Sequence, residues 1–161
     1  DGNLELSMME SSSSIRSLCD LGIYLKFFAE EGDLIIIDEP ELNLHPENQR
    51  KLARLFAKLI NSGLKILITT HSDYIIKELS ILCILNSRKN ILPSVNEISN
   101  VKYELSNLLD LRRVNVFLSK VQNEYVNLYP CKINDMEGII LPTFDDTIQD
   151  INNIMDEIAF S

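Results

Sequence analysis

Two acidic residues follow a short apolar run in the first quarter of the chain. Residues 34–37 are Leu-Ile-Ile-Ile, and Asp38, Glu39 and Pro40 come directly after them. Magnesium-dependent phosphoryl transfer uses such a pair, with one carboxylate for the metal ion and the next for orienting an attacking water. Apolar runs also end in acids by chance. The acidic pair alone therefore does not distinguish a catalytic site from a structural strand that ends in surface charge.

A histidine follows a second apolar run farther along the chain. Residues 64–70 read LKILITT, and His71 comes next, 33 residues after Asp38 (71 − 38). The N–H of an imidazole ring at a strand end could contact a phosphate oxygen. The alternative is that His71 only caps a helix that begins at Ser72.

The elements that position these groups are predicted from the spacing of apolar residues. A helix should run from the serines at 11–14, which suit its N-cap, to Gly32. The apolar run before Asp38 then suits a strand covered on both faces. A second helix should begin at Pro46 and end at Gly63. Its expected buried stripe is Leu52, Leu55, Phe56, Leu59 and Ile60.

The order strand, helix, strand predicts an α/β fold with a parallel βαβ core. A further helix is expected over 72–85. Functional groups gather at the carboxyl ends of parallel strands, so Asp38, Glu39 and His71 should lie at one edge of the sheet.

The second half of the chain predicts a different, α+β arrangement. Residues 87–100 are polar and should form a connection, and 114–133 should form a hairpin. A short strand is expected after Gly138. Thr143 should cap a last, acidic helix. Its expected buried stripe is Ile148, Ile151, Met155 and Ile158.

Composition limits the classes of protein. The chain has 161 residues and a formal net charge of −9, which argues against broad nucleic-acid binding by its own surface. It has no apolar run long enough to span a membrane. Its three cysteines are far apart, which fits a reduced compartment. We therefore expect a cytoplasmic protein with no membrane partner.

The serine run adds a possible anion site, because hydroxyls and free N–H groups at a helix N-terminus bind phosphate. A flexible serine linker is the alternative.

In this order, the serine-started helix, the DEPE strand end and the TTHS strand end resemble the C-terminal half of an ATP-binding-cassette (ABC) ATPase head. The likeness is to bacterial AAA-family ATPases near the RecF, SMC and OLD groups, and it covers about residues 11–85. It implies a half-domain of a P-loop NTPase over residues 1–87. Residues 88–161 would be a C-terminal appendage of hairpin plus helix.

The resemblance implies a role for each matching residue. Asp38 would bind Mg²⁺, Glu39 would be the catalytic base, and His71 would contact the γ-phosphate of ATP. The signature-like serines Ser12, Ser13 and Ser14 would contact ATP on a second protomer, as would Asn43 and His45. Serines replace the glycines of the signature at Ser13 and Ser14, and the usual aspartate of the loop at 43–46 is missing.

No part of the sequence matches G-x-x-x-x-G-K-[ST], the phosphate-binding Walker A loop. We therefore expect this chain alone to be inactive. It would need a second protomer and an N-terminal half that carries the loop, and the resemblance implies a nuclease, toxin or DNA as the target. Two other functions stay open: a non-catalytic dimerisation or effector-binding module, and a two-metal nuclease or phosphatase that also uses Asp145 and Asp146.

Overall fold

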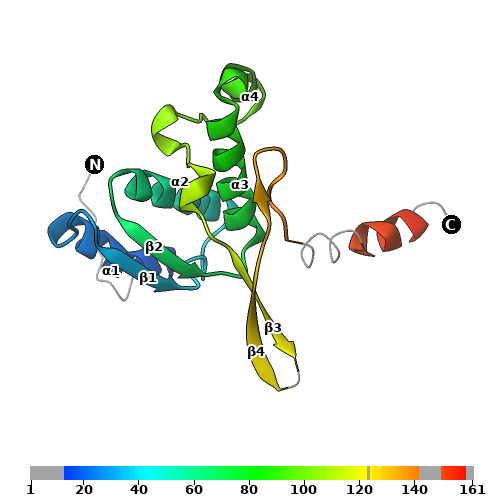
Figure 1. The fold of residues 1–161 in the computed structure, drawn as a ribbon, viewed down its shortest axis with the longest axis horizontal. Coiled ribbons are helices and arrows are strands. Elements are labelled where there is room, and N and C mark those ends of the chain that lie inside the picture. Colours follow the sequence, from blue (N-terminus) through cyan, green and yellow to red (C-terminus); the bar gives the residue numbers. More distant parts are fainter. Residues whose placement is uncertain (1–12, 123, 142–149, 159–161) are drawn as a thin grey trace, which may run out of the picture. The chain divides into compact units, whose positions relative to one another are not determined.

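The computed structural model describes residues 13–122, 124–141 and 150–158, and it has a mixed α/β architecture, as predicted (Figure 1). The chain divides into two compact units. The first comprises residues 1–78 with 104–107, and the second comprises residues 79–103 with 108–161. No helix in the described ranges is both long enough and apolar enough to cross a membrane.

The first unit contains a pair of parallel strands. Strand β1 (Leu34–Asp38) pairs with β2 (Lys65–Thr69), and helix α2 (Pro46–Asn61) connects them along the chain. Figure 1 shows the two arrows side by side and pointing the same way. Asp38 and Thr69 are partners in the register, so both strands end at the same edge.

Helix α2 begins and ends where its sequence signals predict. Pro46 occupies the first turn, His45 is the N-cap, and Gly63 follows the helix with φ +97°, a conformation that glycine adopts without strain. The buried face differs from the prediction at Leu55, which is 37% exposed. The face turned to the core also includes two alanines, Ala53 and Ala57, and Leu55 lies to one side of it.

A small apolar core holds α2 against one face of the two strands. Leu44, Leu52 and Phe56 form its buried centre. The partly buried side chains packed around them are Leu18, Leu21, Ile37, Leu59, Ile66 and Ile68.

The opposite face of the strands is open, which corrects the prediction that the first strand is covered on both faces. Leu34, Ile36 and Leu67 are 57%, 68% and 54% exposed. Side chains alternate between the two faces of a strand, and α1 and α2 pack on only one of them among the described residues.

Helix α1 (Ser13–Phe27) ends earlier than predicted, at Phe27 instead of Gly32. A turn replaces the last part of the predicted helix. The Tyr24 hydroxyl donates to Asp33 Oδ2 at 2.5 Å, and the main-chain N–H of Glu30 donates to the same oxygen at 3.0 Å. Gly32 lies within this turn, with φ +94°.

Helix α3 (Asp73–Ser87) is joined to α2 by a buried ionic network. The Glu78 side chain has no exposed surface and accepts hydrogen bonds from Arg50 Nε at 2.6 Å and Arg54 Nη1 at 2.5 Å. Arg54 is itself 9% exposed. Paired in this way, the charges are tolerated inside the unit, because each is hydrogen-bonded.

The second unit contains a helix that the sequence interpretation missed. Residues 87–100 were expected to be a connection, but they include a 3₁₀ turn, η1 (Lys89–Ile91), and helix α4 (Leu92–Ile98). The proline at position 93 lies in the first turn of α4, where it breaks no helical hydrogen bond.

The predicted hairpin is present in the second unit. Strands β3 (Phe117–Gln122) and β4 (Tyr125–Pro130) are antiparallel. A second, shorter pair, β5 (Ile133–Asn134) and β6 (Gly138–Ile139), follows and includes the expected strand near Gly138. Ser80 of α3 accepts a hydrogen bond from the Ile139 N–H at 2.7 Å, which attaches β6 to that helix.

Residues 150–158 are helical, which agrees with a helix near the end of the chain (Figure 1). Its predicted buried stripe is wrong for the described residues: Ile151, Met155 and Ile158 are 54%, 61% and 68% exposed. Thr143 and Ile148, the predicted cap and first stripe residue, lie outside the described residues.

Candidate functional site

Asp38 and Thr69 end the two parallel strands side by side. The Thr69 hydroxyl donates a hydrogen bond to Asp38 Oδ1. The main-chain N–H of Glu39 is shared between the Thr69 carbonyl and hydroxyl oxygens, each at 3.1 Å. Thr69 therefore fixes both the Asp38 carboxylate and the start of the next residue.

Glu39 and His71 face each other at this edge. Glu39 Oε1 lies 3.7 Å from His71 Nε2. The Glu39 side chain is 38% exposed and the His71 side chain is 87% exposed. The strand ends thus bring together two of the residues singled out from sequence, in a position open to a ligand.

Glu39 has an unusual main-chain conformation. Its φ is +45°, in the left-handed region that non-glycine residues rarely adopt. Such conformations cost free energy and concentrate at functional sites. Here the conformation turns the chain out of β1 directly before Pro40, which is buried.

The alternative role for His71, capping helix α3, is taken by its neighbour. The Ser72 hydroxyl accepts a hydrogen bond from the Ile75 N–H at 3.1 Å, which is the bond of an N-cap. The His71 side chain is directed toward Glu39 instead.

Two residues that the sequence interpretation did not select connect the loops after β1 and β2. Glu41 Oε1 accepts a hydrogen bond from the His71 main-chain N–H at 2.6 Å. Ser72 Oγ and Gln49 Oε1 are 2.5 Å apart, and Gln49 Nε2 donates to the Leu44 carbonyl at 2.9 Å. The second glutamate of DEPE was the available signal for Glu41.

Asn43 and His45 lie in the turn between β1 and α2. Asn43 has φ +63°, which asparagine tolerates better than most residues. His45 Nδ1 accepts the Glu47 N–H at 3.3 Å, so this histidine is the N-cap of α2. Both residues are exposed.

The serine run is only partly described. Ser13 and Ser14 are the first described residues of α1. Ser12 lies outside the described residues.

The strand-end residues fit a magnesium ion. Mg²⁺ prefers hard oxygen ligands, and it is usually held by one or two carboxylates together with water and substrate phosphates. Asp38 offers such a carboxylate on the exposed strand end. Within the described ranges no three His, Cys, Asp or Glu side chains are grouped to hold a metal ion. Asp145 and Asp146 lie outside those ranges.

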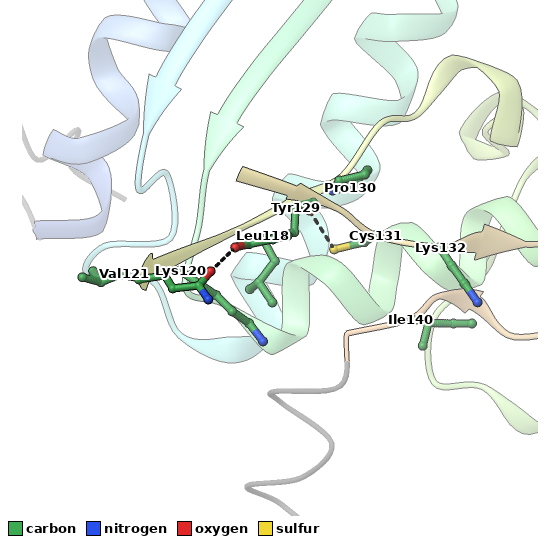
Figure 2. A pocket seen from close by; sticks show the side chains of 9 residues that line it. Leu118, Lys120, Val121, Tyr129, Pro130, Cys131, Lys132 and Ile140 are labelled. Atoms are coloured by element: carbon green, nitrogen blue, oxygen red, sulfur yellow. Dashed lines mark hydrogen bonds between the residues drawn. The ribbon is translucent and has the colours of Figure 1, made fainter. Parts of the chain in front are cut away.

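A pocket of about 860 Å³ lies in the second unit, on the hairpin. Figure 2 shows Leu118 and Cys131 among the side chains that line it, with Lys120 and Lys132 adding two cationic groups. None of the residues selected from the sequence lines this pocket. The full lining is Leu118, Lys120, Val121, Gln122, Tyr129, Pro130, Cys131, Lys132 and Ile140.

Comparison with known families supports an ATPase. The sequence model of the family described as AAA ATPase domain matches residues 10–76 of this chain, a segment that contains β1, α2, β2 and both strand ends. The match supports an AAA-family, ATPase-type domain in that segment. No curated protein and no solved structure gives a significant match to the chain.

Proposed function

We propose that this chain supplies the C-terminal half of an ABC-type ATPase head, which binds and hydrolyses ATP with Mg²⁺ when it is completed by a phosphate-binding loop. Residues 1–87 would form this C-terminal half of the head, and residues 88–161 would form an appendage to it. The observation that carries the proposal is the 3.7 Å approach of Glu39 to His71 at the ends of two paired parallel strands. The family match over residues 10–76 supports the same reaction class.

Each strand-end residue has a role that its position supports. Asp38 would hold Mg²⁺, and the Thr69 hydroxyl orients its carboxylate by donating to Oδ1. Bound Mg²⁺ supplies charge neutralisation at the phosphates. Glu39 would act as the base that orients and deprotonates the attacking water, and His71 would donate a ring N–H to the γ-phosphate.

The backbone geometry supports this division of labour. Glu39 follows Asp38 directly, but its left-handed φ of +45° turns the chain and directs the second carboxylate toward His71. Two neighbouring acids thus acquire different surroundings, and one can serve a metal ion while the other serves a water molecule.

The remaining contacts to nucleotide would come from a second protomer. In this proposal Ser12, Ser13 and Ser14 contact ATP across a dimer, and Asn43 and His45 lie at the same junction. The exposure of Asn43 and His45 supports an intermolecular role.

The open face of β1 and β2 is consistent with a further layer of protein that packs against it. Leu34, Ile36 and Leu67 are exposed apolar residues beside the site, and burying them would contribute about 25 cal/mol per Å² of apolar surface. We propose that the part of the head with the Walker A loop covers this face. The ATPase would serve DNA maintenance or phage defence. Any contact with DNA would be made by another part of the assembly, because this chain is acidic.

Calorimetry with Mg²⁺ and ATP tests the proposal. The chain alone should bind ATP weakly or not at all, and the complete protein with a phosphate-binding loop should bind it. If neither binds, the proposal fails, and the non-catalytic dimerisation or effector-binding module becomes the better account. Robust hydrolysis by the purified chain alone would also contradict the proposal, because it would require no Walker A loop.

A further inference from the structure

Glu41 is a buried acid beside the candidate site. It is 9% exposed, and one of its carboxylate oxygens, Oε1, accepts the His71 main-chain N–H at 2.6 Å. The bond runs from the loop after β1 to the loop after β2. It therefore joins the loop that carries Glu39 to the loop that carries His71.

His71 depends on its main chain for its position. Its side chain is 87% exposed, so little packing restrains the ring. The neighbouring Ser72 is held by α3, through the Ile75 N–H, and by Gln49. The Glu41 hydrogen bond adds the restraint on His71 itself.

The second oxygen of Glu41 is costly to the fold. Oε2 is buried and has no hydrogen-bond partner, the one such side-chain atom in the described ranges. A buried, unsatisfied polar atom destabilises the folded state. An apolar residue of similar size would avoid this cost, so packing alone does not account for a glutamate at this position.

We propose that Glu41 is a positioning residue, which holds the His71 main chain so that the imidazole stays within reach of Glu39 and of a bound phosphate. The proposal rests on the ATPase function proposed above. Glu41 acts through His71 and contacts neither nucleotide nor water in the reaction.

Amide hydrogen exchange on the chain as it stands tests the structural link without any activity. In Glu41→Leu the His71 amide should exchange about tenfold faster or more, because a lost bond of about 1.4 kcal/mol corresponds to a factor of ten. Glu41→Gln keeps an acceptor oxygen and should exchange like the wild type. Glu47→Ala, on the exposed surface of α2, is the control and should change nothing at His71. If Glu41→Leu does not fold, Glu41→Ala takes its place.

A double-mutant cycle on ATP turnover by the complete protein tests the functional link. Glu41→Leu should lower kcat about 10- to 100-fold with little change in KM, and Glu41→Gln should restore most of it. In a His71→Ala background, Glu41→Leu should have no further effect on kcat.

The outcomes separate the two proposals. Unchanged exchange at His71 in Glu41→Leu, or losses that add in the cycle, would overturn the positioning role and leave the ATPase function standing. Absence of turnover in the wild-type complete protein would overturn the ATPase function and with it the catalytic part of this proposal. The exchange result would still decide whether Glu41 holds His71.

Discussion

Nε2 of His71 lies 3.7 Å from Oε1 of Glu39, and the two residues follow neighbouring parallel strands. Asp38 and Thr69, the last residues of those strands, are register partners joined by a hydrogen bond. The site is therefore built by the ends of β1 and β2 and held by contacts between their loops.

The left-handed conformation of Glu39 predicts an inverted order of stability between two substitutions. Glu39→Gly should be more stable than Glu39→Ala by about 1 kcal/mol, because glycine adopts φ near +45° without a Cβ clash. Urea unfolding of the two variants measures the difference. At Lys58, on the exposed face of α2, alanine should instead be the more stable, since glycine weakens a helix by about 0.5–1 kcal/mol. The same order at both positions would refute the strain at Glu39.

The buried network of α2 and α3 predicts a large loss of stability when its acid is removed. Glu78→Ala should lower the free energy of unfolding by about 3–5 kcal/mol, because it leaves the buried Arg54 without its carboxylate. Chemical denaturation measures the loss. Glu47→Ala removes an exposed pair with Lys51 and should cost far less. Similar losses for the two variants would show that burial does not govern the network.

Asp110, in the second unit, should contribute to the stability of the fold in a way that is lost at acid pH. The Arg112 guanidinium and main-chain N–H hold the pKa of Asp110 at about 2, below its ordinary 3.8. A lowered pKa in the folded state stabilises the protein above the ordinary value, and this stability is lost as pH falls from about 4 toward about 2. The wild type should therefore be more stable than Asp110→Asn near neutral pH, and the difference should disappear near pH 2. A difference that stays constant with pH would rule out this linkage.

Cys83 should be the least reactive of the three cysteines. Burial, with a smaller effect of Asp110, raises the pKa of its thiol to about 12, and the thiolate is the reactive form. Alkylation followed by mass spectrometry should label Cys19 and Cys131, which are partly exposed, before Cys83. Unfolding in urea should remove the difference. Labelling of Cys83 at the rate of Cys19 in the folded protein would contradict its burial.

Much of the first unit could be predicted from sequence because its signals are local. Pro46 and Gly63 mark the two ends of α2, and the apolar runs before Asp38 and His71 mark the strands. The exposed face of Leu34 and Ile36 could not be predicted in this way. An apolar run is buried on both faces only where other elements of the fold pack against both faces of the strand. Those tertiary contacts leave no local signal in the sequence.

The candidate site was predictable in part. The types and order of Asp38, Glu39 and His71 placed them at one sheet edge, where the structure also has them. The role of Glu41 required coordinates, because a hydrogen bond to a main-chain N–H thirty positions away (71 − 41) leaves no sequence pattern. Helix α4 was missed because the proline at 93 indicates a turn and a helix start equally well.

ATP turnover by Glu39→Gln, measured together with the phosphate-binding loop that the proposed function requires, tests the role of Glu39 most directly. We expect hydrolysis to fall by roughly 10²–10⁴, as for the loss of a general base. Binding of ATP with Mg²⁺, measured by calorimetry, should persist, because glutamine keeps the size of the side chain and Asp38 is unchanged. Unchanged turnover in Glu39→Gln would contradict the assignment of Glu39 as the base, and with it the proposed ATPase site.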